Sequence, residues 1–310
     1  MALNKGRVYT GGLYRLELDG INAGWVNNVE GGMPKAEVVT EKIGVDHIAR
    51  KHIAGVSYED MTFKVGAAMS KGFYQWLEAT LKLDEKGQVK NGAVVSANYE
   101  LKEMSRLDFT NARITEFAMP ALDAKGKDPA WITVKARPEF TRKKLAEGGK
   151  VSAPTDAAKQ KKWLPSNFRL KIDGLDEVCS RVSKIDALTV KQKVTENPVG
   201  EMREYEILNT SVEIPNLVIT FPESHAKPML DWFESFVVKG ECGQDKEKGG
   251  ALEYLTPDLK TVLFTVEFKQ MGIFKLSPEK KEAHAEGILN WKAELYVEEM
   301  TLKHSGDVFA

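Results

Sequence analysis

Two segments of this chain carry nearly the same seven residues, half a chain length apart. Tyr14-Arg15-Leu16-Glu17-Leu18-Asp19-Gly20 returns as Phe168-Arg169-Leu170-Lys171-Ile172-Asp173-Gly174, an offset of 168 − 14 = 154 residues. Both segments alternate in polarity as a half-buried strand does, and both end in a turn, where glycine accepts a positive φ at little cost. A repeat of this length corresponds to a whole domain. The sequence therefore predicts two domains of one fold in tandem.

Length and composition agree with this division. The 310 residues correspond to about two domains of ordinary size, and 42% hydrophobic residues suffice for two cores. We expect a first domain at residues 1–141 and a second at 164–310, joined by a basic flexible linker at 142–163. The linker carries seven cations, Arg142, Lys143, Lys144, Lys150, Lys159, Lys161 and Lys162. Its composition is typical of a solvated tether, and a phosphate-binding strip is the alternative.

Charge and cysteine content exclude little but favour an intracellular origin. The chain has 44 basic and 45 acidic residues, so its overall field gives no reason to expect binding to nucleic acid or to a membrane. Its two cysteines, Cys179 and Cys242, are too few for a disulfide framework and are expected as reduced thiols. We find neither a secretory signal nor a run of 18 apolar residues, and we expect the chain to be made and kept in the cytosol.

The first half reads as antiparallel strands with one helix. Strands are expected at residues 13–18, 58–66, 93–101, 107–117 and 131–140, and a long hairpin is expected within 31–55. Ser70 is placed to cap a helix whose apolar face holds Phe73, Trp76, Leu77, Thr80 and Leu81. The hairpin holds more apolar residues than a solvated loop needs, so we expect a neighbour to bury part of it.

The second half repeats this order. Strands are expected at residues 168–172, 211–221, 261–270, 271–276 and 289–302, with a hairpin at 188–194 and 202–210. A helix follows Pro228, and its Trp232 corresponds to Trp76. The sequence therefore predicts a mainly β (α+β) fold class with two tandem antiparallel domains, each with one flanking α-helix and a long protruding hairpin.

Several motifs of the first half, taken in order, resemble the T4-like phage tail tube family. They are Arg50-Lys51-His52-Ile53-Ala54-Gly55, Tyr58 to Gly66, Phe73-Tyr74-Gln75-Trp76-Leu77-Glu78, Asp108-Phe109-Thr110-Asn111-Ala112, Ile114 to Pro120, Asp123-Ala124-Lys125-Gly126 and Trp131 to Phe140. Together they cover most of residues 13–142. The second half departs from the pattern, because Lys269-Gln270-Met271-Gly272 replaces Phe-Thr-Asn-Ala and a charged run from Glu279 to Glu286 replaces the Lys-Gly turn. It therefore resembles a diverged second copy.

The resemblance implies that each domain is a tail-tube-type antiparallel β-barrel or sandwich with one flanking helix. It also implies a structural protein of a contractile phage tail or a phage-like injection system. Six such domains would close into a ring, and rings would stack into a tube around a lumen for DNA or protein cargo, which passes without sequence-specific binding. Three two-domain chains would make a pseudo-six-fold ring; six chains with the second barrel outside is the competing arrangement. The implied partners are the chain itself and the sheath, baseplate or hub, and terminator proteins of the apparatus, with no membrane. The implied location is a virion tail or phage-like particle, assembled in the bacterial cytoplasm.

In that family the long hairpin reaches the next ring, so the resemblance implies that both hairpins contribute to stacking. The candidate stacking residues are Val38, Glu41, Ile43, Val45, His47, Ile48, Arg50, Ile53, Val190, Val194, Met202, Tyr205 and Ile207. The alternative is that the hairpins pack within their own domain. Candidate core anchors of the two helices are Phe73, Trp76, Leu77, Leu230, Trp232 and Phe233.

Motifs for chemistry are absent from the sequence. The chain has no phosphate-binding loop, no nucleophile elbow and no His-Glu-x-x-His motif. His47 and His52 lie close in sequence without a nearby cysteine, which is typical of exposed histidines and not of a metal site. We expect no catalytic residue, no metal and no cofactor, and we expect the protein not to be an enzyme.

Two other functions stay open from the sequence. The first is a tube initiator or adaptor that joins a three-fold spike or hub to a six-fold tube, a task that suits two diverged copies in one chain. The second is a monomeric ligand-binding β-barrel or a hydrolase with scattered catalytic groups. Rings or tubes in electron micrographs would distinguish the assembly functions from the monomeric ones.

Overall fold

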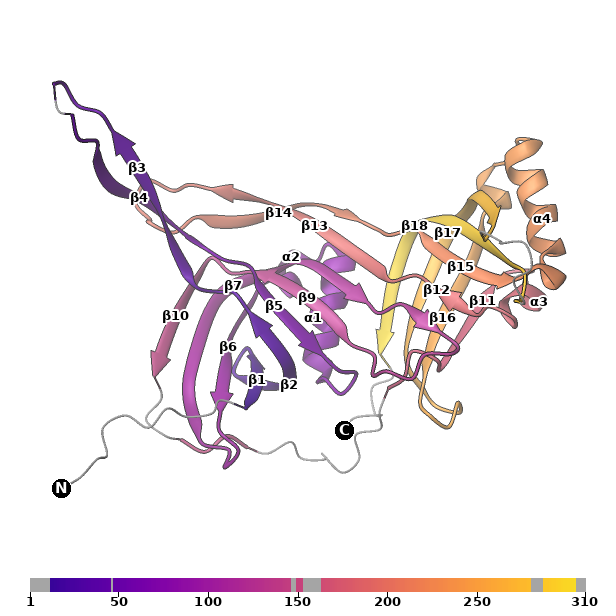
Figure 1. Cartoon of the computed structure of the whole chain (residues 1–310), viewed down its shortest axis with the longest axis horizontal. Helices are drawn as coiled ribbons and strands as arrows, with labels where there is room; N and C mark the ends of the chain where they lie inside the picture. Colours follow the sequence, from indigo (N-terminus) through magenta and orange to yellow (C-terminus); the bar gives the residue numbers. More distant parts are fainter. Residues whose placement is uncertain (1–11, 46, 146–148, 153–162, 280–286, 305–310) are drawn as a thin grey trace.

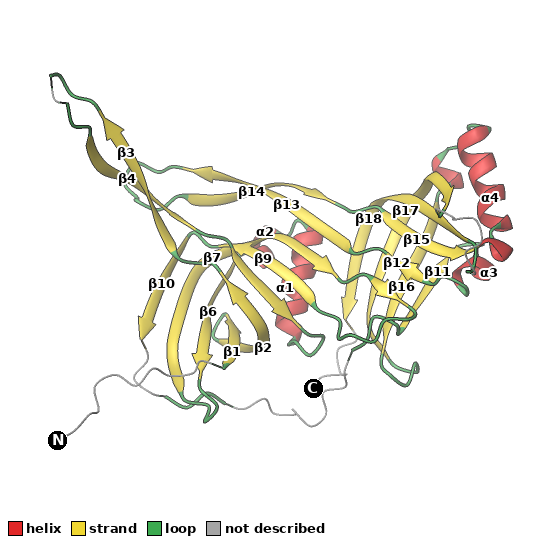
Figure 2. Ribbon diagram, viewed as in Figure 1, coloured by secondary structure: helices red, strands yellow, loops and turns green. Residues whose placement is uncertain are grey.

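The computed structural model describes residues 12–45, 47–145, 149–152, 163–279 and 287–304. The described chain is mainly β, with two large antiparallel sheets side by side and a two-stranded hairpin that projects from one end (Figure 1). Helices flank each of the two large sheets (Figure 2). The predicted fold class, mainly β with an antiparallel barrel, is confirmed.

Six strands of the first half close into a barrel. In order around the barrel they are β6 (Lys90–Ala97), β1 (Leu13–Leu18), β2 (Ile21–Glu30), β5 (Met61–Val65), β9 (Ile132–Arg137) and β7 (Glu103–Met119). The ring closes because β7 pairs with β6 through one part of its length and with β9 through the other. Closure leaves these strands without an unpaired edge.

Helix α1 (Lys71–Lys82) flanks this barrel. Its apolar face, with Phe73, Trp76 and Leu77, is fully buried. The indole N–H of Trp76 donates to the backbone carbonyl oxygen of Gln88 at 2.8 Å, which ties α1 to the one-turn helix α2 (Glu85–Gln88). Ser70 is the N-cap residue of α1, but its side chain makes no capping hydrogen bond.

The second half repeats the strand order without closing it. Its order is β16 (Lys248–Leu255), β17 (Val262–Pro278), β18 (Asn290–His304), β15 (Leu217–Pro222) and β12 (Lys184–Ile185), with β11 (Phe168–Ile172) on the far side of β16. This is the order of the first barrel, but β11 and β12 do not pair as β1 and β2 do. Helix α3 (Asp176–Cys179) lies between β11 and β12 in the chain. The second unit is therefore an open form of the same barrel.

The backbone repeats even where the sequence does not. Asn111 in β7 and Gln270 in β17 occupy equivalent positions, with φ of 50° and 52°. Leu101 and Leu259, in the loops before these strands, both have φ of 59°. The Phe-Thr-Asn-Ala motif is thus replaced in the second copy without a change in the backbone. It also follows that the predicted strands 261–270 and 271–276 are one strand, β17, because Gln270 forms an irregularity and not a turn.

The helix of the second unit differs from its prediction. It consists of α4 (Lys227–Phe233) and a π-helical turn at Glu234–Val238, after a 3-10 turn at Glu223–His225; a further 3-10 turn spans Gln244–Lys246. Met229, Trp232 and Phe236 are buried, and Phe233 is half-buried. Leu230, expected in the core, is 37% exposed, because the buried side chains at 229, 232 and 236 take the face of the helix that meets the sheet. Both cysteines are free thiols, Cys179 buried and Cys242 exposed.

The expected linker is partly a strand. Arg142 to Leu145 belong to β10 (Phe140–Leu145), which pairs with β7, and Val151 and Trp163 are buried. The rest of the predicted linker, apart from residues 149–152, lies outside the described residues. Strand pairing also crosses the predicted division of the chain, because β8 (Leu122–Asp123) pairs with β12 of the second sheet. The two units are therefore joined by more than a tether.

A continuous apolar core joins the two units where α1 meets β18. Tyr74 of α1 stacks on His304 of β18 with ring centroids 4.2 Å apart, and Phe264 of β17 lies 6.0 Å from the Tyr74 ring. The Tyr74 hydroxyl donates to the carbonyl oxygen of Ala67 at 2.6 Å. Burial, together with the nearby charge of Lys71, lowers the pKa of His304 below its ordinary value of 6.5.

The burial of His304 predicts a pH-dependent contact between the units. Because the folded chain binds this proton less well than the unfolded chain, the contribution to stability is full above about pH 6.5 and declines as the pH falls below it. We expect the urea midpoint of unfolding to fall when the pH is taken below 6.5, and to fall less in His304→Phe. His52→Phe, on the exposed hairpin, is the matched control. An equal fall in the wild type and in His304→Phe would contradict the assignment.

Candidate assembly surfaces

The projecting hairpin exposes apolar side chains along its strands. It is formed by β3 (Pro34–Glu41) and β4 (Arg50–Tyr58), which pair only with each other among the described strands (Figure 1). Val38 and Ile53 lie opposite one another across the pair and are 59% and 58% exposed. No described part of the chain covers these apolar side chains on the two-stranded ribbon, so the hairpin presents a surface for a partner.

The tip of the same hairpin is also apolar. Ile43 is exposed, and Val45 and Ile48 are 97% and 75% exposed. The polar residues of the predicted stacking set lie among them: His47 is exposed, Glu41 lies 3.9 Å from His52, and Arg50 starts β4. The structure thus brings together on one projection all the stacking residues expected in the first half.

The second hairpin lies along the first barrel instead of projecting. It is formed by β13 (Leu188–Asn197) and β14 (Glu206–Glu213), and β13 pairs with β7, so the hairpin extends the first sheet. Val190 and Ile207, expected on a stacking surface, are buried within the chain. Their burial within the chain does not fit a stacking surface: Val190 lies opposite Phe117 of β7, and the backbone N–H of Ile207 donates to Glu139. Val194 and Tyr205 are half-buried, and Met202 is exposed.

A buried polar cluster fixes the second hairpin in place. The side-chain oxygen of Gln88 accepts a hydrogen bond from the amide of Gln192 on β13 at 2.7 Å, and another from the amide of Asn209 on β14. Gln88 and Gln192 are almost completely buried. Buried amide groups cost free energy unless they are paired, so this cluster favours one register of the hairpin on the barrel. Sequence reasoning missed it, since isolated glutamines carry no signal.

Charged groups continue the contact toward the base of the projecting hairpin. The backbone N–H of Ile207 donates to Glu139 at 3.1 Å, and Arg137 lies 3.7 Å from Glu196. Arg142 donates to Glu204 at 3.1 Å, and this bond lowers the pKa of the Glu204 carboxyl. The second hairpin is thus held on the first barrel at both of its strands.

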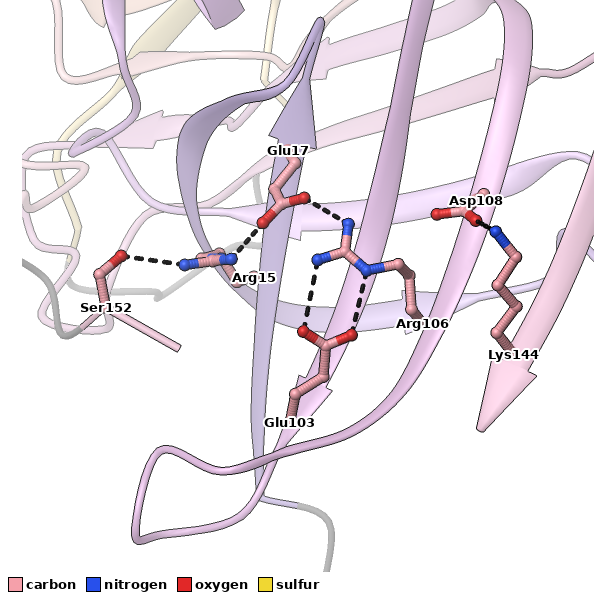
Figure 3. A network of polar contacts seen from close by, with 7 residues as sticks. All are labelled: Arg15, Glu17, Glu103, Arg106, Asp108, Lys144 and Ser152. Atoms are coloured by element: carbon pink, nitrogen blue, oxygen red, sulfur yellow. Dashed lines mark hydrogen bonds and ion pairs between the residues drawn. The ribbon is translucent and has the colours of Figure 1, made fainter. Parts of the chain in front are cut away.

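A third polar network lies on the outer face of the first barrel (Figure 3). Arg106 of β7 bridges Glu17 and Glu103, with bonds of 2.6 and 3.0 Å, and Arg15 contacts both Glu17 and Ser152. These carboxylates raise the pKa of Arg106. Beside it, the Lys144 ammonium of β10 donates to Asp108 of β7 at 2.7 Å. Every charge of this network has an opposite partner, so the network fastens segments to the barrel and leaves no group poised for chemistry.

Within the described residues, no group of three or more histidine, cysteine, aspartate or glutamate side chains is arranged to hold a metal ion. Across the same residues, no helix has the length and apolar content needed to span a bilayer.

The first barrel is similar to a known protein family. Residues 12–136 match the family described as T4-like virus tail tube protein gp19, and this range covers the six strands of the closed barrel up to one residue before the end of β9. No curated protein matches the chain significantly. The resemblance expected from the motifs of the first half is confirmed.

Solved structures of contractile injection systems show weak similarity. A baseplate chain of the anti-feeding prophage is 16% identical over 44% of this chain and 91% of its own length, with a TM-score of 0.35. The sheath/tube terminator of an extracellular contractile injection system is 14% identical over 44% and 93%, also at 0.35. Hcp1 from Flavobacterium johnsoniae is 12% identical over 44% and 93%, at 0.27.

The polar cluster yields a prediction about stability. Gln88→Met removes the acceptor shared by Gln192 and Asn209 and leaves buried donors unpaired. We expect a loss of about 1–3 kcal/mol in the free energy of unfolding, together with faster hydrogen exchange in β13 and β14. Lys193→Met, on the exposed face of β13, is the matched control and should change little. Unfolding at the same urea concentration as the wild type would show that the cluster does not hold the hairpin.

Proposed function

Because residues 12–136 match the T4-like virus tail tube protein family, we propose that this chain is a structural subunit of the inner tube of a contractile tail or phage-like injection system. The family name describes a structural tube protein and not an enzyme. The proposal extends to stacked rings around a lumen, through which DNA or protein passes. The observation that carries it is the closed tail-tube-type barrel with a long apolar hairpin that no part of the described chain covers.

The tandem arrangement supports three chains per ring. The two units share one strand order and one set of backbone irregularities, and a shared apolar core fixes them side by side. Two similar units at a fixed angle within one chain halve the number of chains that a ring of six units requires. A head-to-tail contact that repeats this angle would close after a fixed number of chains.

The hairpin tip supports stacking between rings. Ile43, Val45 and Ile48 are exposed at the far end of the longest projection of the chain (Figure 1). Their burial against the next ring would remove apolar surface from water, at about 25 cal/mol for each Å². Sheath, baseplate or hub, and terminator proteins would then contact the outside and the ends of the tube. We place the assembled particle in a bacterial host, with assembly in the cytoplasm.

A tube initiator or adaptor is the second candidate. The observation that favours it is the difference between the units: the first barrel is closed, whereas the second leaves β11 and β12 unpaired with each other. A ring of such chains has two kinds of unit in alternation, which matches a three-fold partner on one face and a six-fold partner on the other.

Negative-stain electron microscopy of the purified chain at high concentration tests the proposal. Tubes support the main-tube function, and single rings that bind a tube end support the adaptor. A monodisperse species of 34.6 kDa would overturn both and leave a monomeric binding module as the function.

The hairpin tip gives a sharper prediction. The triple variant Ile43→Ser, Val45→Ser and Ile48→Ser removes apolar surface from the tip alone, so we expect rings without long tubes and an unchanged unfolding transition. Ile288→Ser, at another exposed apolar position, is the control and should leave tubes intact. Tubes of normal length from the triple variant would refute a stacking role for the tip.

A further inference from the structure

The contact between the second hairpin and the first barrel has a fixed register. Leu188 lies opposite Met119, Val190 opposite Phe117, and Lys191 opposite Glu116. This pairing occupies the end of β7 on the edge that continues from β6, because β9 occupies the other edge. The hairpin of one unit therefore completes the sheet of the other unit.

The equivalent edge of the second unit is open. Strand β17 is the counterpart of β7: both have an irregularity in the same place, between Ile114 and Glu116 in β7 and between Ile273 and Lys275 in β17. Beyond Met271, β17 pairs with β18 on one edge, and no described strand pairs with its other edge. The side chains there are correspondingly less covered, since Phe274 is 41% exposed and Leu276 is half-buried, whereas Phe117 is buried.

The equivalent hairpin is also open. By chain order and strand order, β3–β4 is the counterpart of β13–β14, so β3 corresponds to β13. The edge of β3 that faces away from β4 has no partner among the described strands. Among the described residues, neither β3 nor this edge of β17 has a partner, although they correspond to β13 and β7, which pair with each other.

We propose that β3 of one chain pairs with the open edge of β17 in a second copy of the chain, in the geometry that β13 and β7 adopt within one chain. This inference rests on the proposed function, and it names the partner and the contact residues. We align β3 on β13 by their first residues, Pro34 and Leu188, which are 154 residues apart, as are the two copies of the repeated segment. With this alignment, transfer of the register places Ala36 opposite Leu276 and Glu37 opposite Lys275. Pro34 and Pro278 fall opposite each other at the outer end of the pairing, where the missing N–H of proline is least costly.

Charge selects this pairing over the alternatives. In the contact within the chain, Lys191 lies opposite Glu116, which itself binds Lys135 of β9 at 3.0 Å. At the corresponding positions of the second unit, Lys275 binds Glu294 of β18 at 2.7 Å. In the proposed contact, Glu37 of the second copy lies opposite Lys275.

Across the three adjacent strands, the charges are therefore basic, acidic and basic in the contact within the chain. In the proposed contact between chains they are acidic, basic and acidic. Exchange of the two hairpins would place like charges opposite each other, which is unfavourable across a strand pair. Each hairpin is thus suited to one strand edge only.

A second copy is required because the chain cannot make this contact with itself. The projecting hairpin leaves the first barrel at one end of the molecule, and β17 lies at the other end (Figure 1). Each chain therefore donates one hairpin and receives one. Such a head-to-tail contact produces a closed ring when the rotation between chains closes, as the proposed ring requires.

Disulfide trapping tests the register directly. Full-length chain with Cys179→Ser and Cys242→Ser receives Ala36→Cys and Leu276→Cys, and it is oxidised at a concentration where particles form. We expect covalent dimers and higher multimers on a denaturing gel without reductant. The same background with Thr40→Cys and Leu276→Cys places the cysteines out of register and should remain largely monomeric. Equal crosslinking in both variants, or none in the first, would overturn the register.

Charge reversal tests the same contact without cysteines. Glu37→Lys alone should abolish particles, since it brings a lysine opposite Lys275. The double variant Lys275→Glu and Glu294→Lys keeps the ion pair between β17 and β18, so the monomer should stay folded but fail to assemble. Combination of all three substitutions restores opposite charges and should restore assembly. Failure of the triple variant to assemble, with a wild-type unfolding transition, would overturn the role of this charge pattern.

The outcomes separate this inference from the proposed function. Rings or tubes that form without the Ala36–Leu276 crosslink would retain the tube function and overturn the pairing of β3 with β17. Absence of both particles and crosslinks at every concentration would overturn the two together.

Discussion

The structure depends on which strands supply hydrogen-bonding partners to the edges of each sheet. Backbone N–H and C=O groups on an open edge need hydrogen bonds, and an exposed edge recruits other strands. The first unit satisfies its edges twice, by closure of β7 onto β9 and by addition of β13. The second unit has the same strand order but lacks the added hairpin on β17. One chain therefore contains both a completed contact and the two unfilled halves of its counterpart.

The two hairpins show what each contact demands of its residues. The hairpin within the chain is fixed by polar groups, since Gln192 and Asn209 share Gln88 as an acceptor. In the projecting hairpin, Val38 takes the place of Gln192 and lies opposite Ile53, so this position of the hairpin is apolar. A contact made once, on folding, can contain a buried cluster of paired polar groups. A surface that is buried only on assembly costs less free energy to remove from water when it is apolar. The difference between the hairpins matches one contact made on folding and one made on assembly.

Much of this arrangement could be predicted from the sequence. The rest could not, for physical reasons that differ from one element to the next. The repeat at Tyr14 and Phe168 predicts two units of one fold, and the family resemblance of the first half is confirmed by the match to residues 12–136. The alternation around Val190 predicts a strand but does not say which sheet receives it, so its burial against the other unit was missed. Residues 142–145 look like a linker because they are basic, although their backbone pairs with β7. Leu230 has the spacing of a core residue, but the sheet meets the other face of α4.

The central claim is that sister copies of the chain cover the open edges of β3 and β17. Hydrogen exchange measured on dilute, dissociated chain and on assembled particles tests it most directly. The account predicts that the backbone amides of β3 and those between Gly272 and Pro278 become protected on assembly, while those of β13 are protected in both states. Equal exchange of the two edges in dissociated and assembled material would contradict it.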